Sequence, residues 1–214
     1  LKNSNYGFFQ PHELEKDTIQ YGDNGGAQWT GASIDPYKNI MYVTASNIPW
    51  KVGVISYSSK KNTRIKYVDK PEKPLRDLDG YPGVKPPWGT LTAMNLNTGK
   101  IKWQVPLGYY ESLKAKGIIT GTENFGGATA TAGGVVFAAG TLDKLIRAFD
   151  SENGQELWSY KLPYIGSAPP TIYEINGEQY IVIPASGGMT LKLFYKDLVE
   201  QGDAVVAFKI KKKE

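Results

Sequence analysis

A segment that occurs twice, 55 residues apart, constrains the fold of this chain more than any other feature. Ala93–Leu107 returns as Ala148–Leu162, and both copies keep an alanine, an Asn or Asp two residues later, a glycine, a tryptophan and a final leucine. A fixed period of this size is typical of stacked or radial architectures, because one supersecondary unit cannot bury its apolar face alone. Each glycine follows Thr98 or Asn153 in a turn dipeptide, and the tryptophan four residues later can dock against the next unit.

The sequence around the repeat predicts an all-β fold. The chain holds 14 Tyr, 7 Phe, 5 Trp, 24 Gly and 13 Pro, a profile that suits many short strands joined by tight turns. Two units of four strands each are expected, followed by a third unit that lacks its outermost strand. The expected strands are 28–33, 40–46, 89–95 and 100–107; 128–131, 134–139, 145–150 and 156–162; and 170–174, 179–184 and 204–210. Antiparallel units of four strands in radial array indicate β-propeller blades.

We therefore expect a single propeller segment over residues 1–214, with about three blades of a larger ring. Its expected parts are the end of a preceding blade (1–24), two blades (25–107 and 125–162) and an incomplete closing blade (166–210). The chain opens on Leu1, so we expect it to be a piece of something longer, completed by the remaining blades. Three long insertions are expected at 48–88, 108–124 and 187–202, and the first is stiff and aromatic enough to form a lid.

Charge and composition exclude several classes of function. The net charge is +4, and its one dense cluster, Lys209–Glu214, is interpreted as a solvated tail, so no nucleic-acid partner is expected. The chain has no cysteine, which excludes disulfides, thiolate metal sites and cysteine nucleophiles. No stretch approaches ~18 apolar residues, so we expect no membrane span. The only histidine, His12, lies in the segment before the first blade, where a catalytic role is not expected.

An ordered set of motifs adds a resemblance to a known family. Gly25–Gly31 (GGAQWTG), Pro86–Ala93 (PPWGTLTA), Gly121–Gly127 (GTENFGG) and Thr131–Phe137 (TAGGVVF) occur in that order, together with both repeats. This set resembles the pyrroloquinoline quinone (PQQ)-dependent dehydrogenases, and within them the glucose and sugar enzymes rather than the methanol enzymes. The resemblance covers the chain from about Phe8 onward.

The resemblance implies a fold, a reaction and a location. It implies an eight-bladed propeller with PQQ flat on the ring axis and Ca²⁺ beside it. A sugar or alcohol loses a hydride to the quinone, a base takes the hydroxyl proton, and electrons pass to ubiquinone or a cytochrome. It also implies the bacterial periplasm, with attachment to the inner membrane through an N-terminal region that this chain lacks.

Three inner loops carry the residues that the resemblance assigns to PQQ. Gln28 takes the place of an asparagine that reaches a PQQ oxygen, and it is followed by Trp29, which has a packing role between blades as its alternative. Asn124 and Phe125 occupy the matching loop of the next blade, and Gly187 and Gly188 that of the third, where methanol-type relatives have a tryptophan at the position of Met189. Glycines in these loops allow a flat ligand to approach the backbone closely.

The family's catalytic residues are not expected in this chain. The resemblance places the catalytic aspartate, the PQQ-contacting basic residue and the Ca²⁺ ligands mostly in earlier blades, so no catalytic or metal residue is assigned and the chain alone should not turn over substrate. Asn47 stands where sugar-oxidising relatives often have an acid, and Asp143 is expected to cap a hairpin turn. Trp103 and Trp158 are expected to be structural.

Two other readings of the sequence remain open. A non-catalytic propeller of the same repeat superfamily would serve as an assembly scaffold at the bacterial outer membrane, binding partners by its edges and loops. A lectin-like propeller is the third reading. In every case an incomplete ring exposes blade faces, so self-association of the isolated piece is expected.

Overall fold

The structure is a computed structural model, and it describes the chain except for residues 1–3, 8–9, 22–24, 58–65, 196–198 and 210–214. The chain forms two compact units, each made of two separate stretches of sequence. The first unit comprises Leu1–Gly25 and Asn47–Lys85, and the second comprises Gly26–Ser46 and Pro86–Glu214.

The first unit is one small sheet. Its strands lie in the order β1-β2-β6-β7, with β8 also paired to β6. These strands are β1 (Ser4–Tyr6), β2 (Asp17–Gln20), β6 (Trp50–Ser56), β7 (Tyr67–Asp69) and β8 (Lys73–Pro74). β1 and β2 are parallel, and the other pairs are antiparallel. The expectation of one long loop over 48–88 is therefore wrong in part, because that segment contains three strands.

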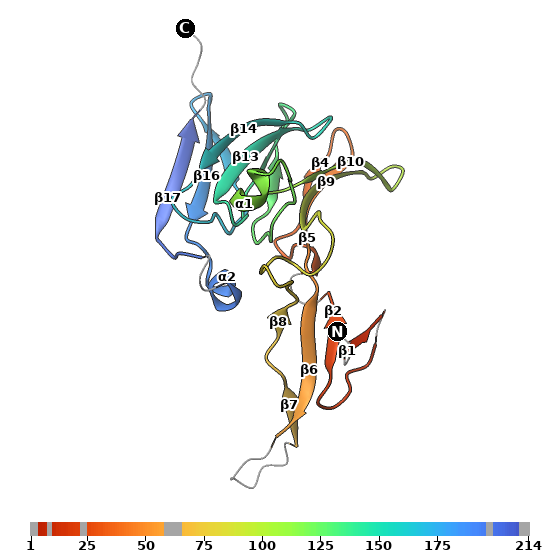
Figure 1. Cartoon of the computed structure of the whole chain (residues 1–214). Coiled ribbons are helices and arrows are strands. Elements are labelled where there is room, and N and C mark those ends of the chain that lie inside the picture. The colour runs from red at the N-terminus through yellow and green to blue at the C-terminus, as the bar shows by residue number, and fades with distance from the viewer. Residues whose placement is uncertain (1–3, 8–9, 22–24, 58–65, 196–198, 210–214) are drawn as a thin grey trace. The chain divides into compact units, whose positions relative to one another are not determined.

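The second unit begins with a five-stranded sheet that contains the first copy of the repeat. Its order is β10-β9-β5-β3, with β4 paired to β5 (Figure 1). The strands are β3 (Gly25–Ala27), β4 (Ser33–Asp35), β5 (Ile40–Asn47), β9 (Gly89–Asn95) and β10 (Lys100–Pro106). The single strand expected over 28–33 is wrong, because the chain turns between β3 and β4 and Gly31 takes a φ of 89°.

Two further sheets follow, close to the expected boundaries. A four-stranded sheet has the order β11-β12-β13-β14, and a three-stranded sheet has the order β15-β16-β17. Their strands are β11 (Ala128–Ala130), β12 (Val135–Ala138), β13 (Leu145–Asp150), β14 (Glu156–Lys161), β15 (Thr171–Ile175), β16 (Glu178–Ala185) and β17 (Ala204–Lys209). All pairs in both sheets are antiparallel. The all-β class with blade-like antiparallel sheets is confirmed, while the boundaries of the blades and the ring of eight stay predictions.

Two short helices complete the described part of the second unit. They are α1 (Glu111–Lys114), in the link between β10 and β11, and α2 (Met189–Phe194), between β16 and β17.

The repeated residues have matching structural roles in the two copies. The Oδ1 atoms of Asn95 and Asp150 each accept hydrogen bonds from the backbone N–H groups two and three residues later, which forms the turn. The repeat alanines face the repeat tryptophans across the strands, Ala93 opposite Trp103 and Ala148 opposite Trp158. The register shifts by one residue beside each pair. A small residue opposite an indole leaves room for the ring, which explains the conserved spacing.

Apolar cores lie between successive sheets of the second unit. The first contains residues of the first two blade-like sheets, namely Ile40, Tyr42, Leu91, Ala93, Trp103, Leu107, Ala128, Val136, Ala138 and Phe149. The second joins the four-stranded sheet to the three-stranded one through Phe137, Ala139, Ile146, Ala148, Leu162, Ile181, Ile183 and Ala185. β12 contributes alternate residues to the two cores, so both of its faces are buried. That explains why its sequence is apolar throughout rather than alternating.

Candidate functional site

The turn between β3 and β4 carries the first two residues expected to bind a cofactor. Its backbone is fixed by hydrogen bonds from Gln28 N to Thr44 O (2.9 Å) and from Gly31 N to Gln28 O (3.1 Å). The side chain of Gln28 is buried, whereas Trp29 is 88 % exposed. The packing alternative for Trp29 is therefore not realised within this chain, and its indole face is open to a ligand or to another part of the protein.

The next inner loop brings Asn124 against β5, the strand that also bonds the turn at Gln28. Asn124 is fully buried, and its N–H donates to Ser46 Oγ (3.0 Å) while its Nδ2 donates to Ala139 O (3.0 Å). Ser46 Oγ also accepts from Gln28 Nε2 (3.3 Å). Gln28 and Asn124, far apart in sequence, are thus joined through one serine hydroxyl on β5.

Asn124 Oδ1 has no hydrogen-bond partner among the residues that the structure describes. A buried acceptor without a donor costs about 1–3 kcal/mol, so native proteins usually supply one from water or a ligand. This oxygen is enclosed by the chain itself, so an added donor would reach it only after the loop had opened.

Phe125 and the third inner loop meet at Ile165. Phe125 is buried in an apolar cluster with Ile165, Tyr195 and Val199, and its ring lies edge-on to Tyr195. Gly187 donates its N–H to Ile165 O (2.9 Å), and Gly188, the residue before α2, accepts from Lys192 N within that helix (3.3 Å). Of Met189, only the backbone in α2 is described.

The glycines of these loops have a packing reason that does not involve a ligand. A Cβ on Gly126 would lie 2.3 Å from Ala139 O, and one on Gly187 would lie 2.0 Å from Glu200 O. Real Cβ atoms do not approach so closely, and Gly187 also has a φ of 79°. The chain's own backbone therefore occupies the space beside Gly126 and Gly187 in which a flat ligand was expected.

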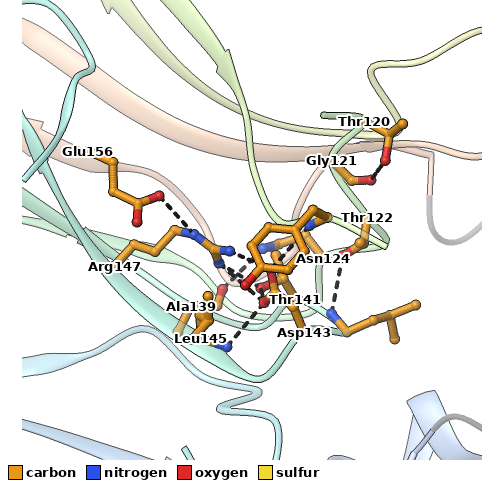
Figure 2. A network of polar contacts seen from close by, with 12 residues as sticks. Thr120, Gly121, Thr122, Asn124, Ala139, Thr141, Asp143, Leu145, Arg147 and Glu156 are labelled. Atoms are coloured by element: carbon orange, nitrogen blue, oxygen red, sulfur yellow. Dashed lines mark hydrogen bonds and ion pairs between the residues drawn. The ribbon is translucent and has the colours of Figure 1, made fainter. Parts of the chain in front are cut away.

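A buried ion pair fixes the neighbouring hairpin (Figure 2). Asp143 and Arg147 are both buried and are joined by two hydrogen bonds, and Arg147 also donates to Glu156 (3.1 Å). Asp143 Oδ1 accepts from Leu145 N (3.1 Å), so its expected role in the turn is confirmed. Its Oδ2 accepts from Tyr109 N (3.1 Å), which ties the segment after β10 to this hairpin.

The segment between β10 and β11 is held at further points. Thr122 Oγ1 accepts from Leu142 N (3.1 Å), and Tyr110 donates its hydroxyl to the buried Glu123 (2.7 Å). Trp88 lies edge-on to Tyr110. This insertion is therefore packed into the second unit, to which it belongs, and it leads directly into Asn124.

Sequence motifs alone do not point to Ser46, Glu123 or Arg147. For Ser46 a signal was present, because the buried positions of β5 change from apolar to hydroxyl side chains along the strand. For Arg147 the signal was a charge between the apolar residues Ile146 and Ala148 of a mostly buried strand. His12 is exposed and belongs to the first unit, whereas the loops described above belong to the second.

Neither a metal cluster nor a membrane-spanning helix emerges from the described part of the chain. Those residues contain no group of three or more His, Cys, Asp and Glu side chains arranged to hold a metal ion. None of the helices formed by those residues is both long and apolar enough to cross a bilayer.

Comparison with known families gives a specific match. The family model described as "Glucose/ethanol/alcohol dehydrogenase, beta-propeller domain", a PQQ family, matches residues 2–181. The chain belongs to the PQQ-dependent dehydrogenase β-propeller family. Its membership fits the repeat, the inner loops and the stacked sheets.

Curated relatives of this PQQ-dependent propeller segment are longer proteins. It is 34 % identical to the glycerol dehydrogenase large subunit of Gluconobacter oxydans (strain 621H), covering 87 % of this chain and 30 % of the relative. It is 31 % identical to the quinate/shikimate dehydrogenase (quinone) of Acinetobacter baylyi, covering 89 % and 26 %. For the quinoprotein glucose dehydrogenase of Escherichia coli (strain K12), the identity is 28 % and the coverage 94 % and 28 %. The chain spans less than a third of each.

A solved structure supports the fold of the PQQ-dependent propeller segment. The quinohemoprotein alcohol dehydrogenase from Comamonas testosteroni matches 91 % of this chain and 28 % of its own, with a TM-score of 0.62 and 20 % identity.

The residues present fit PQQ, a flat quinone with polar edges. Trp29 offers an open aromatic face and Gln28 offers a side-chain amide, whereas the Asn124 acceptor is enclosed behind them. Flat ligands stack on such faces and take their orientation from a few polar groups. Cofactor contact at Gln28, Trp29, Asn124, Phe125, Gly187 and Gly188 stays a prediction.

Proposed function

We propose that this chain is the C-terminal part of a larger PQQ-dependent dehydrogenase that oxidises a hydroxyl group of a sugar or alcohol. The family match supports the reaction class, and the short coverage of each relative supports a larger whole. The observation that carries the proposal is that Gln28 and Asn124 are hydrogen-bonded to the same hydroxyl, that of Ser46, beside the exposed Trp29. Two polar side chains and an aromatic face therefore come from neighbouring inner loops.

For the substrate we propose a glucose-like sugar or a polyol. The named relatives act on glycerol, quinate or shikimate, and glucose. These compounds share several hydroxyl groups, so a polyhydroxylated substrate is the class that the relatives have in common.

The six predicted residues would hold and orient the cofactor. Gln28 and Asn124 would supply polar contacts and Trp29 a stacking face, while Phe125, Gly187 and Gly188 would shape the loops behind them. Bound PQQ supplies the acceptor for the hydride, and the substrate carbinol becomes a carbonyl as its hydroxyl proton passes to a base. We place that base, the Ca²⁺ ligands and the remaining blades outside this chain, so the chain alone is proposed to be inactive.

The cellular setting follows from the same proposal. We propose a periplasmic enzyme, attached to the inner membrane through a segment outside this chain. It would pass electrons to a quinone or a cytochrome.

The test is dye reduction by the full-length protein that carries this chain. Apoprotein is loaded with PQQ and Ca²⁺ and given glucose, glycerol, quinate or ethanol with an artificial electron acceptor. We expect PQQ-dependent turnover with a sugar or polyol, and none from residues 1–214 alone. Absence of turnover with all four substrates in a folded, PQQ-loaded protein would contradict the proposal and favour the scaffold reading.

A further inference from the structure

We propose that Ser46 is a positioning residue for the cofactor site: its hydroxyl fixes the orientation of the Gln28 amide and couples it to the Asn124 loop. This inference rests on the proposed function and adds a residue to it. Ser46 lies on β5 and is buried, so it acts on a ligand through Gln28 while its bonds to the fully buried Asn124 hold it in place.

The buried face of β5 changes character along the strand. Ile40 and Tyr42 belong to the apolar core between the first two blade-like sheets, but the next two buried positions are Thr44 and Ser46. A buried hydroxyl is unfavourable unless it is hydrogen-bonded. The two hydroxyls therefore need partners, and both find them on the Asn124–Gly127 loop.

The hydroxyl of Ser46 uses its full hydrogen-bonding capacity. It accepts from Gln28 Nε2 (3.3 Å) and from Asn124 N (3.0 Å), and it donates to Asn124 O (3.3 Å). A serine hydroxyl has one proton and two lone pairs, so these three bonds leave nothing spare.

This arrangement sets the orientation of the Gln28 amide. Because the hydroxyl proton goes to Asn124 O, Ser46 presents only lone pairs to Gln28. A flipped amide would place Oε1 against those lone pairs without a proton between them. Ser46 therefore holds Nε2 on its own side, and the second N–H and Oε1 of Gln28 are left to a ligand.

Other hydroxyls that bond the same loop lack this contact. Thr30 Oγ1 and Thr44 Oγ1 both donate to Gly126 O, at 2.9 and 3.4 Å, and hold the loop without bonding Gln28. A matched amide–hydroxyl pair also exists away from the site, because Gln104 Nε2 donates to Thr92 Oγ1 (2.8 Å) between β10 and β9. Thr92 is buried, as Ser46 is, and provides a control.

The test is a titration of the full-length apoprotein with PQQ, followed by quenching of intrinsic fluorescence, with Tm measured without cofactor. Loss of one oriented amide contact predicts a Kd about fivefold higher for Ser46→Ala. Ser46→Thr, which keeps the hydroxyl, is expected to stay within about twofold of wild type, and so is Thr92→Val. Equal rises in Kd for Ser46→Ala and Thr92→Val would show a merely structural role and overturn the inference.

A double-mutant cycle tests whether Ser46 acts through Gln28. In a Gln28→Ala background, Ser46→Ala is expected to change the Kd by less than about twofold, because the amide that it orients is gone. Additive effects would overturn the inference, and so would an unchanged Kd for Ser46→Ala in a protein whose wild type binds PQQ. A wild-type protein that does not bind PQQ would instead overturn the proposed function, and this inference with it.

Discussion

The two repeat tryptophans occupy the same position in sequence but different environments. Trp103 is 9 % exposed, and its Nε1 donates to Ser151 O (3.0 Å) in the turn of the next sheet. Trp158 is 39 % exposed and packs beside Tyr160 and Phe208. Both face a repeat alanine across the strand, so the repeat itself does not decide whether the ring is buried.

Trp103 lies against a glycine turn of the next sheet, at Gly154, where a Cβ would approach the ring to 2.7 Å. Aligning Ala148-Phe149 with Ala207-Phe208 puts Lys213 in the sequence position of Gly154, and Lys213 lies outside the described residues. The burial of Trp103 therefore involves a glycine turn in the neighbouring sheet as well as the tryptophan itself.

Truncating each tryptophan should give the largest difference between the two copies. Trp103→Ala removes a buried ring and its hydrogen bond, and is expected to lower the free energy of unfolding by about 3–5 kcal/mol. Trp158→Ala removes a partly exposed ring and is expected to cost about 1 kcal/mol. Urea unfolding of the 214-residue chain, followed by circular dichroism, measures both. Equal losses would show that the interfaces do not differ.

Alanine at the two repeat glycines should sharpen the comparison with a smaller effect. Gly99 and Gly154 have φ values of 68° and 75°, so alanine costs about 1 kcal/mol of backbone strain at either. At Gly154 the added Cβ also meets Trp103, for a further 1–3 kcal/mol or so, whereas nothing lies within 4 Å at Gly99. The same unfolding experiment should therefore rank Gly154→Ala below Gly99→Ala in stability. The reverse order would contradict the docking contact.

The charged contact beside the buried Trp103 should give the smallest effect on stability. Hydrogen bonds from Lys102 and then Lys38 lower the pKa of Glu152 from 4.5 to about 2. A lowered folded-state pKa means that the stabilisation is present above about pH 4.5 and is lost as the pH falls toward 2. Asn97 takes the equivalent place in the first copy and carries no charge.

Thermal unfolding between pH 7 and pH 3 measures this contribution. The Tm of wild type should fall more steeply below pH 4.5 than that of Glu152→Gln, which lacks the titrating carboxylate. Glu178→Gln is the comparison variant, because Lys209 also lowers the pKa of Glu178 from within the three-stranded sheet. With a single lysine in that ion pair, the difference between its Tm curve and that of wild type is expected to be smaller than the difference for Glu152→Gln. Parallel Tm curves for wild type and Glu152→Gln would show that the ion pairs add nothing measurable.

Local patterns were sufficient to predict most of the second unit. Strands such as Gly89–Asn95 and Leu145–Asp150 follow from turn glycines and apolar runs, and the family resemblance rests on adjacent residues. The turn between β3 and β4 was missed because the sequence over 28–33 does not show that Gly26 and Gly31 take positive φ values. The strands within 48–88 were missed because β6 pairs with β2, a partner distant in sequence.

The candidate site was predictable only in part for the same reason. Gln28, Trp29 and Asn124 are predicted from motifs, each within one loop. Ser46 could not, because its role depends on two loops that meet only in the folded sheets. Likewise Asp143 was expected in a turn, but its buried pairing with Arg147 is a side-chain contact that spacing alone does not reveal.

The central claim is that the inner loops of this chain bind PQQ while the repeats hold its sheets together. Equilibrium titration of the full-length apoprotein with PQQ tests it most directly, comparing Gln28→Ala with Gln104→Ala, the glutamine that bonds Thr92 away from the inner loops. We predict saturable binding of one PQQ per chain, weakened by Gln28→Ala and unchanged by Gln104→Ala. No saturable binding, or equal weakening by the two substitutions, would contradict the account.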